Sequence, residues 1–414
     1  MLFFARESFP TYRVDIDVLF GKELVGRGHE IDFVMQAESP DDSIGPVKWR
    51  GRTVWVGGTA SGHGWLSRAL KLLRSFWHDA ITLLRLARRD RYDSVQVRDK
   101  FVIGALASFV AQWRGLRYFY WLSFPVPESQ IDQATEGTAR FPVVNVVRGR
   151  LFGWLLYRVI LPSCDHVFVQ SLRMKEDLAR HGTDPGKMTA VPMGIDLDEW
   201  PSVSEVSNGP STAGLVVGYL GTLGSQRRLE VLIDALAILR RRGIDVRFLF
   251  VGGSDKRDDL TRLEKRATQM GVTDRIEITG HLPRAAALAR MSAVDVALSP
   301  FYPTAILQST SPTKLVECMA MGLPVVANTH PEQKVVLRDS AAGVCVPWGA
   351  RHFARGIAWL AKRSAEERRE IGLRGRAWVV EHRAYGVIAS EVEATYQQVL
   401  SHRARAGSCT GHGG

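Results

Sequence analysis

Residues 311–327 read Ser-Pro-Thr-Lys-Leu-Val-Glu-Cys-Met-Ala-Met-Gly-Leu-Pro-Val-Val-Ala. Ser311 can cap a helix whose first position is Pro312, because the first residue of a helix needs no N–H. Gly322 is suited to end this helix, and the apolar run at 324–327 is typical of a buried strand. A helix that leads into a buried strand is half of an alternating α/β unit, so this stretch predicts a parallel sheet.

The start of this predicted helix is suited to bind an anion. Free N–H groups and the helix dipole favour negative charge there, and Lys314 adds a full positive charge in the first turn. Glu317 follows on the same face as Thr313 and Lys314, where its carboxylate can accept hydrogen bonds from a pair of ribose hydroxyls. The alternative is an ordinary amphipathic helix with both charges solvated, and spacing alone does not decide between the two.

The same alternation extends through the chain. An apolar run at 3–5, a helical pattern at 15–27 that ends at Gly28, and an apolar run at 30–35 form a βαβ unit, whose right-handed crossover implies parallel strands. Further apolar runs typical of strands lie at 94–97, 118–122, 167–170, 215–220, 246–251, 276–279 and 294–299. The predicted fold class is α/β, with parallel sheets in Rossmann-like domains.

The length of 414 residues suits two domains. Residues 201–213 are rich in Ser, Pro and Gly and lack apolar periodicity, so we expect a linker there between domains over 1–200 and 214–385. A helix over 386–403 is expected to pack back towards the first domain, followed by a disordered tail over 404–414. Two such domains in tandem are expected to form a cleft at the carboxyl ends of their strands.

Composition excludes several classes of protein. The hydrophobic fraction of 45% with 23% charged residues is ordinary for a globular chain and too apolar for a disordered one. No run of about 18 apolar residues is present, and the chain starts with a strand-like segment rather than a signal peptide, so we expect a cytoplasmic location. The four cysteines lie far apart without a C-x-x-C pair, which favours neither disulfides nor a zinc site.

The 54 basic and 43 acidic residues give a net charge of +11, which suits polyanions or an anionic membrane surface as partners. A basic amphipathic pattern over 66–89 is typical of a helix at the surface of an anionic bilayer, and 148–158 is similar but shorter. Its apolar stripe consists of Leu66, Ala69, Leu70, Leu73, Phe76, Trp77, Ala80, Ile81 and Leu84, and the basic residues on its other faces are Arg68, Lys71, His78, Arg85, Arg88 and Arg89. The alternative is that the stripe packs on its own sheet.

A second group of residues with binding chemistry follows the strand at 215–220. Gly221 and Gly224 let a ligand approach the backbone, and Arg227 and Arg228 can clamp a diphosphate. Gly252 and Gly253 repeat the strand-to-glycine arrangement after 246–251. The alternative for that pair is a tight turn that requires positive φ.

Two Asp-x-Asp sequences, at 15–17 and 196–198, are similar to metal-binding motifs. The first lies at a helix start, where acidic residues complement the helix dipole, and the second follows a loop glycine. Neither context supplies converging ligands, and the histidines lack metal-ligand spacing, so we expect no metal site.

Together these stretches resemble the retaining GT-B glycosyltransferases of family 4, which use nucleotide-sugar donors. The resemblance covers most of the chain and rests on several motifs in the right order: Phe9-Pro10, Arg27-Gly28-His29-Glu30, Val191-Pro192-Met193-Gly194-Ile195-Asp196, the loop at Gly221, Val251-Gly252-Gly253, and 317–327. It implies two facing Rossmann-like domains, with the donor held mainly by the second and the acceptor by the first. It also implies a nucleotide diphosphate sugar as co-substrate and no metal or other cofactor.

The resemblance assigns roles to individual residues. Glu317 matches the ribose-binding second glutamate of the family's E-x7-E motif, Arg227 stands where the family usually has the lysine that holds the donor phosphates, and Lys314 completes the catalytic set. The implied donor-binding residues are Gly221, Thr222, Arg228, Gly253, His281, Leu282, Ser309, Thr310, Ser311 and Thr313. Of these, His281 and Leu282 are expected near the base, and 309–313 near the sugar and diphosphate.

The sequence departs from the family pattern at several positions. Ser309 replaces the first glutamate of E-x7-E, Thr222 replaces a frequent arginine, and 11–13 replaces a glycine pair. The loop 120–125 lacks a histidine that is often found there. Arg13, at the start of a helix expected to face the cleft, and Ser123 in the loop are the acceptor-side candidates.

The predicted function is transfer of a sugar from a nucleotide diphosphate sugar to a glycan or lipid-linked acceptor, with retention of configuration, in polysaccharide or glycoconjugate biosynthesis. The chain is expected in the cytoplasm, with peripheral contact to the inner membrane surface through 66–89. The alternatives are a nucleotide-sugar epimerase on the same fold, a catalytically lapsed homologue, and a polyanion-binding protein. The last lacks a recognisable nucleic-acid module, so we expect no nucleic-acid partner.

Overall fold

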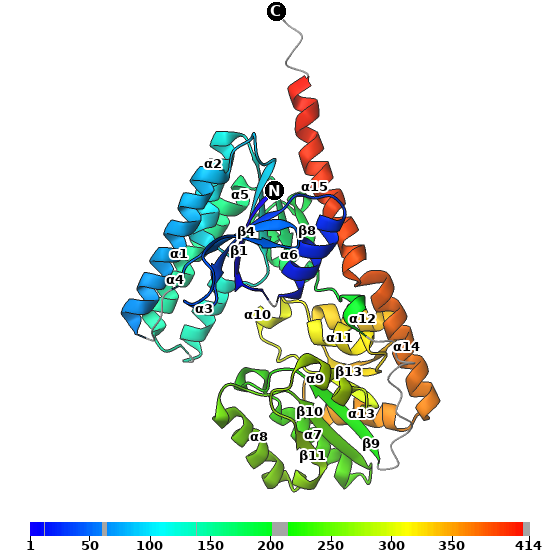
Figure 1. Cartoon of the computed structure of the whole chain (residues 1–414). Coiled ribbons are helices and arrows are strands. Elements are labelled where there is room, and N and C mark those ends of the chain that lie inside the picture. Colours follow the sequence, from blue (N-terminus) through cyan, green and yellow to red (C-terminus); the bar gives the residue numbers. More distant parts are fainter. Residues whose placement is uncertain (12, 60–63, 138, 201–213, 409–414) are drawn as a thin grey trace, which may run out of the picture. The chain divides into compact units, whose positions relative to one another are not determined.

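The computed structural model describes residues 1–11, 13–59, 64–137, 139–200 and 214–408 (Figure 1). It divides into two compact units, of which the first comprises Met1–Pro192 with the C-terminal segment from Tyr385, and the second comprises Met193–Ala384. Each unit is built on a largely parallel sheet covered by helices, which confirms the predicted fold class.

The first unit has an eight-stranded sheet in the order β3-β4-β2-β1-β5-β6-β7-β8, in which β3 alone runs antiparallel to its neighbour. The strands are β1 (Leu2–Phe9), β2 (Asp32–Ala37), β3 (Gly45–Trp49), β4 (Arg52–Gly57), β5 (Ser94–Arg98), β6 (Arg117–Leu122), β7 (His166–Val169) and β8 (Met188–Ala190). The helices are η1 (Asp15–Leu24), α1 (Trp65–Leu86), α2 (Phe101–Arg114), α3 (Val126–Thr135), α4 (Pro142–Trp154), η2 (Leu155–Ile160), α5 (Leu161–Ser163), α6 (Leu172–Arg180) and η3 (Pro185–Lys187).

Two apolar cores cover the two faces of this sheet. On one face α1, α2 and η2 pack on strand residues such as Val97 and Tyr120. On the other face η1 packs with α15 (Tyr385–Ser408), whose Tyr396 hydroxyl donates to Gln96 in the middle of the sheet. The helix α15 extends to Ser408, and 409–414 of the predicted disordered tail lie outside the described residues.

The boundary between the units lies earlier than the sequence predicted. Residues 193–200, including η4 (Leu197–Glu199), belong to the second unit. The backbone N–H of Met193 donates to Ser311 Oγ at 3.0 Å, that of Ile195 donates to the Arg383 carbonyl at 2.8 Å, and Trp200 is buried in the second core. These tertiary contacts hold residues 193–200 in the second unit. The predicted linker over 201–213 lies outside the described residues.

The second unit has a six-stranded parallel sheet in the order β11-β10-β9-β12-β13-β14. Its strands are β9 (Leu215–Leu220), β10 (Val246–Val251), β11 (Ile276–Ile278), β12 (Val296–Ser299), β13 (Val325–Asn328) and β14 (Gly343–Val346). Its helices are η6 (Ser225–Arg227), α7 (Glu230–Arg241), α8 (Arg257–Met270), η7 (Thr273–Arg275), α9 (Arg284–Met291), α10 (Ala305–Gln308), α11 (Thr313–Ala320), α12 (Pro331–Ser340), α13 (Ala350–Ala361) and α14 (Ala365–His382).

The strand order of the second unit fixes where a ligand is expected. The chain adds β10 and β11 on one side of β9, and β12, β13 and β14 on the other. In open α/β sheets such a reversal opens a crevice at the carboxyl ends of the two strands that flank it. Helices α7, α8 and α13 cover one face of this sheet and α9, α11 and α12 the other. The strand order therefore predicts a ligand site at the carboxyl end of β9.

Most of the exposed large apolar side chains lie on three helices of the first unit, which we call the three-helix surface. They are Leu70, Leu72, Leu73, Trp77, Ile81 and Leu84 on α1, Val102, Phe109 and Trp113 on α2, and Phe141, Val143, Val144, Val147, Leu151 and Trp154 on α4 and the residue before it. These helices lie next to one another on the same side of the sheet (Figure 1). Among the described residues, no helix is long and apolar enough to cross a membrane.

Candidate functional site

A cavity of about 280 Å³ lies in the second unit at the carboxyl ends of β9 and β10. It is lined by Tyr219, Leu220, Gly221, Thr222, Arg227, Val251, Gly252, Gly253, His281, Leu282, Ala287 and Lys314. Seven of the residues that the sequence assigned to the donor side therefore line one cavity: Gly221, Thr222, Arg227, Gly253, His281, Leu282 and Lys314. They come from the loops after two neighbouring strands, the segment before α9, and the first turn of α11.

Glycines form the floor of this cavity because the two strand ends approach too closely for side chains. A Cβ on Gly252 would lie 2.0 Å from the carbonyl oxygen of Gly221, and one on Gly253 would lie 2.6 Å from the His281 ring. Gly221 and Gly252 also have φ of 150° and 142°, which only glycine adopts readily. Gly252 thus has the positive φ predicted as the alternative from the sequence, and the close approach seen there is that of the Gly221 backbone.

Two cations face the cavity without a carboxylate among its lining residues. Arg227 lies at the end of η6 with its Cζ 5.7 Å from the centre of the Phe301 ring, and its Nε is buried with no hydrogen-bond partner among the described residues. Lys314 lies in the first turn of α11 and is 39% exposed. The cavity is therefore suited to an anion, because two cationic side chains and no carboxylate line it.

Glu317 does not line the cavity itself but contacts Lys314, which does. Lys314 Nζ donates to Glu317 Oε2 at 2.8 Å, and the glutamate side chain is only 15% exposed. The predicted shared face of the two residues is confirmed by this contact. In this arrangement the carboxylate holds the ammonium group at the edge of the cavity.

Tyr219 is a cavity residue that the sequence did not single out. Its hydroxyl donates to the Thr222 carbonyl at 3.0 Å and so holds the loop after β9, and burial raises its pKa to about 12. The phenol therefore stays neutral and acts as a donor at physiological pH. Its position at the end of a strand, two residues before Gly221, is the signal that could have identified it.

The start of α11 differs from the prediction. Pro312 precedes the first helical residue, and Ser311 does not cap the helix. Instead Ser311 Oγ accepts from the Met193 N–H and donates to Glu332 Oε1 at 2.9 Å. The predicted cap was wrong because two distant segments of the chain converge on this hydroxyl.

Glu332 belongs to a buried ion pair that the sequence did not reveal. Arg383 Nη2 lies 2.8 Å from Glu332 Oε1, and both side chains are almost fully buried. Burial raises the pKa of Glu332 above its ordinary value, although Arg383 and Ser311 oppose the shift. Glu332 follows Pro331 at a recognisable helix start, but nothing in the sequence links it to Arg383.

The other predicted donor residues lie outside the cavity wall. Arg228 has φ of 51° and stacks on Tyr302, with its Cζ 5.6 Å from the ring centre, and it lines a separate open cavity of about 950 Å³. Ser309 is buried, and Thr310 Oγ1 donates to the Leu307 carbonyl at 2.7 Å. Thr313, the first residue of α11, is half-buried and does not line the cavity.

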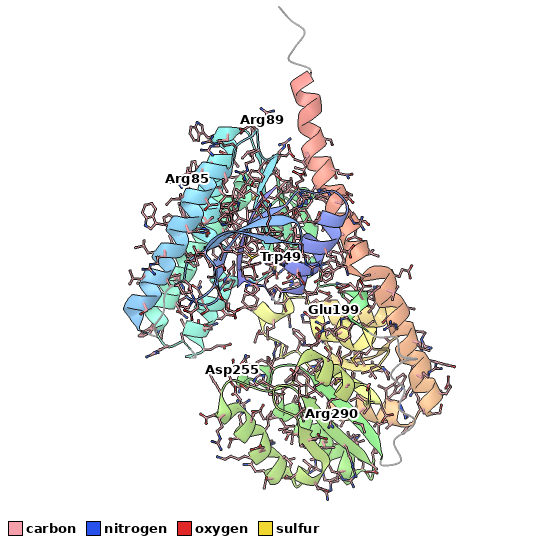
Figure 2. All side chains as sticks on the ribbon, in the orientation of Figure 1. Trp49, Arg85, Arg89, Glu199, Asp255 and Arg290 are labelled. Carbon is pink, nitrogen blue, oxygen red and sulfur yellow. The ribbon has the colours of Figure 1, made fainter. Side chains whose placement is uncertain are left out.

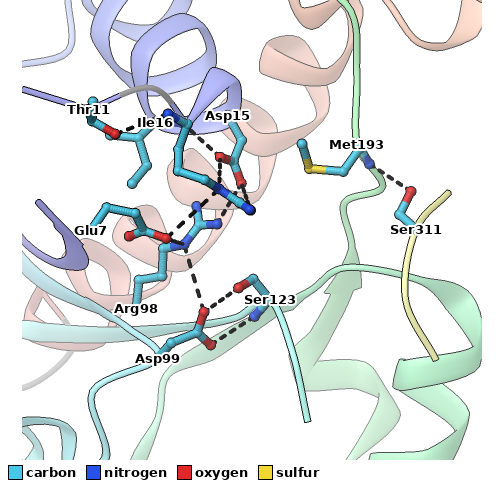
Figure 3. A network of polar contacts seen from close by, with 10 residues as sticks. Glu7, Thr11, Asp15, Ile16, Arg98, Asp99, Ser123, Met193 and Ser311 are labelled. Carbon is cyan, nitrogen blue, oxygen red and sulfur yellow. Dashed lines mark hydrogen bonds and ion pairs between the residues drawn. The ribbon is translucent and has the colours of Figure 1, made fainter. Parts of the chain in front are cut away.

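The first unit contains a buried charge cluster at the carboxyl ends of β1 and β5 (Figure 3). Arg98 is fully buried, with Nη2 2.7 Å from Asp15 Oδ2 and Nε 3.3 Å from Glu7 Oε1. Asp99 completes the group and accepts from the N–H of Ser123 at 3.0 Å and from its hydroxyl. Burial would raise the pKa of Asp15, but Arg98 and Arg13 hold it below its ordinary value.

Both acceptor-side candidates contact this cluster. Arg13 Nε lies 3.4 Å from Asp15 Oδ1, and its side chain is 45% exposed, so part of the guanidinium remains accessible. Ser123 is buried and bound to Asp99, whose pKa is raised by burial. Ser123 therefore supports a buried carboxylate, whereas Arg13 is the residue of the pair that a ligand can reach.

The two Asp-x-Asp sequences have local partners. Asp15 binds arginines, as described above, and Asp196 Oδ1 accepts from the Asp198 N–H at 3.4 Å at the start of η4. Within the described ranges, no group of three or more His, Cys, Asp or Glu side chains is arranged to hold a metal ion.

Two family models match the chain. Residues 18–199 match the one described as Glycosyltransferase Family 4, and residues 214–363 match the one described as Glycosyl transferases group 1.

Similarity to curated proteins covers part of the chain. It is 28% identical over 213 residues to a phosphatidyl-myo-inositol mannosyltransferase of Mycobacterium leprae, across 51% of this chain and 54% of that protein. It is 30% identical over 225 residues to a 2-deoxystreptamine glucosyltransferase of Streptomyces kanamyceticus, across 54% of each protein. The chain thus spans about half the length of these relatives.

Solved structures match almost the whole chain. A sucrose-phosphate synthase from Thermosynechococcus elongatus has a TM-score of 0.73 at 18% identity, covering 97% of this chain and 99% of that one. HepE from Anabaena, solved in complex with UDP, has a TM-score of 0.67 at 16% identity, covering 96% and 99%. At such identities the similarity concerns the fold.

Proposed function

Because the chain belongs to glycosyltransferase family 4 and has the GT-B fold, we propose that it transfers a glycosyl group from a nucleotide diphosphate sugar to a glycan or lipid-linked acceptor. The observation that carries this proposal is the cavity at the ends of β9 and β10. It combines a glycine floor with Arg227 and Lys314, and no carboxylate lines it. A diphosphate is the part of the donor that such a site suits best.

In the proposed complex, the backbone after β9 and β10 approaches the diphosphate. Arg227 and Lys314 bind its oxygens, while His281 and Leu282, which line the same cavity, contact the nucleoside. Glu317 accepts hydrogen bonds from the ribose hydroxyls and keeps Lys314 in position through their 2.8 Å contact. The UDP bound to HepE, a neighbour of the same fold, supports a nucleoside diphosphate as the ligand.

The proposed reaction breaks the bond between the anomeric carbon and the leaving phosphate oxygen, and forms a bond from that carbon to an acceptor hydroxyl oxygen. The hydroxyl proton passes to the departing diphosphate on the same face of the sugar, which retains the anomeric configuration. Negative charge develops on the diphosphate as it leaves, and Arg227 and Lys314 stabilise it where it forms. No separate protein base is required by this route.

A lipid-linked acceptor would be met at the cytoplasmic face of a membrane, in glycoconjugate or polysaccharide assembly. One relative is named for a phosphatidyl-inositol acceptor, which supports this class. The basic amphipathic segment over 66–89 also supports it, because most of its large apolar side chains are exposed on α1.

Thermal unfolding in the presence of UDP, GDP, ADP, CMP and their sugars tests the donor site. A donor at about 100 times its dissociation constant adds about 2.7 kcal/mol to the stability of the native state. We expect one nucleotide to raise the melting temperature of the wild type and of Arg247→Ala, an exposed arginine at the other end of β10, and to have little effect on Glu317→Ala.

No shift with any nucleotide would contradict the proposal and favour a lapsed enzyme. With the matching donor, release of a rearranged sugar in the absence of an acceptor would instead identify an epimerase. Salt-sensitive polyanion binding that nucleotide sugars do not compete would indicate the polyanion-binding alternative.

A further inference from the structure

The apolar side chains of α1 form a buried stripe and an adjacent exposed stripe, so packing on the sheet accounts for only some of them. Ala80 and Leu83 are buried against the sheet. Leu73, Trp77 and Ile81 are exposed, with Trp77 at 55%. One stripe therefore covers the core, and the other presents large apolar groups to solvent. The side chains of Leu66 and Arg68 lie outside the described residues.

The exposed face of α1 continues onto α2 and α4. Phe109 and Trp113 of α2 are 67% and 78% exposed, and Phe141 and Trp154 lie at the two ends of α4 at 56% and 57%. Beneath them α2 is held to α4 by the buried stack of Phe101 on Phe152, whose ring centres are 4.9 Å apart. The apolar groups thus stand on a rigid layer of helices.

The exposed charged residues of the described parts of α1, α2, α4 and η2 are basic. Exposed basic residues border it at both ends of α1 and along α4, for example Lys71, Arg85 and Arg150. Figure 2 shows Arg85 and Arg89 beside the C-terminal end of α1. The sequences of α1, α2, α4 and η2 contain one acidic residue, Asp79, which is buried and paired with Lys100 at 2.6 Å.

From these observations we propose that the three-helix surface docks on the surface of an anionic lipid bilayer. Apolar and aromatic side chains enter the boundary between head groups and acyl chains, and the surrounding arginines and lysines bind the lipid phosphates. A protein partner would have to cover a large apolar area and could not form ion pairs with an exposed acidic residue of these helices. An anionic bilayer provides an apolar phase for the apolar groups and phosphates for the basic groups. The inference extends the proposed function by naming the surface at which a lipid-linked acceptor is reached.

Vesicle flotation of the full chain tests the proposal without donor or acceptor. We expect the protein to float with vesicles of phosphatidylcholine and phosphatidylglycerol in equal parts, and to stay at the bottom with phosphatidylcholine alone. Replacing Trp77, Trp113 and Trp154 together by serine should lower the bound fraction about tenfold, as should replacing Arg85, Arg89 and Arg150 by glutamate. High salt should weaken binding of the wild type.

Trp359→Ser is the matched control, because Trp359 is exposed on α13 of the second unit and should not affect flotation. The proposal is overturned if the wild type binds neither kind of vesicle, or if the triple serine variant floats as well as the wild type. It is also overturned if the triple variant instead abolishes a concentration-dependent dimer seen by sedimentation, because a second copy would then occupy the surface. A nucleotide-induced thermal shift that survives a failed flotation would leave the glycosyl transfer proposal standing.

Discussion

Replacing Arg227 by methionine should reduce activity without reducing stability. The buried Nε of Arg227 lacks a partner among the described residues, which costs about 1–3 kcal/mol. Its contact with the Phe301 ring at 5.7 Å stabilises the folded state by about 0.5–1 kcal/mol. Methionine keeps the apolar stem and removes the unsatisfied donor, so we expect the free energy of unfolding in urea to fall by no more than about 1 kcal/mol.

Activity, unlike stability, should fall strongly in Arg227→Met. A preorganised donor that faces developing negative charge contributes about 2.7–4 kcal/mol to the transition state, which corresponds to about 10²–10³-fold in kcat. We expect a loss of this size in the rate of nucleoside diphosphate release, with a smaller change in the KM for the donor. Arg247→Met, an exposed arginine on β10, should leave the rate unchanged.

Two results would refute this reasoning. Wild-type turnover in Arg227→Met would show that the guanidinium does not contact the leaving group. A loss of several kcal/mol in unfolding free energy, in parallel with the loss of activity, would show that Arg227 is a structural residue.

Three further substitutions test the packing around the sites. Gly252→Ala should abolish the donor-induced thermal shift, because its Cβ would lie 2.0 Å from the Gly221 oxygen at φ of 142°, and urea unfolding should show a loss of about 2 kcal/mol or more. Arg383→Met should cost about 3 kcal/mol near neutral pH, since it leaves the Glu332 carboxylate buried without its cation. The raised pKa of Glu332 means that the protonated carboxyl is the favoured buried form, so this loss should shrink as pH falls towards its ordinary value of 4.5, and an equal loss at all pH values would contradict the assignment. Arg98→Met removes the cation shared by three carboxylates and should cost about 3–5 kcal/mol, and an unchanged urea midpoint would contradict the buried cluster.

The alternation of elements and several residues that line the cavity at the ends of β9 and β10 could be predicted from the sequence. Apolar runs separated by helical patterns specify a parallel α/β sheet, and the carboxyl ends of such strands are where ligands bind. Gly221 directly follows an apolar strand, Gly253 is the second residue after one, and Lys314 lies in the first turn of α11. Each of these residues lies in or just after a strand or helix, so the pattern of neighbouring residues is sufficient to predict its position.

Residues whose partners are distant in sequence could not be predicted. Ser311 has the sequence context of a helix cap, yet Met193 and Glu332 converge on its hydroxyl. Arg98 is part of a strand and would ordinarily be exposed, but Glu7 and Asp15 make its full burial tolerable. Only the folded chain brings these groups together.

The orientation of α1 on the sheet likewise could not be predicted from the sequence. Its sequence contains two apolar faces, and periodicity alone does not show which one covers the sheet. The stripe of the sequence prediction mixed Ala80, which is buried, with Trp77 and Ile81, which are exposed. Small and large residues both pack against the sheet, for example Ala80 and Leu83, so residue size does not identify the buried stripe.

The most direct test of the central claim is calorimetric titration of a nucleoside diphosphate and the corresponding monophosphate into the wild type and into Arg227→Met/Lys314→Met. The claim is that these two cations bind the diphosphate of the donor at the ends of β9 and β10. We expect the wild type to bind the diphosphate at least about tenfold more tightly than the monophosphate, and the double variant to lose most of that preference. Equal affinity for both nucleotides in the wild type, or an unchanged preference in the double variant, would contradict it.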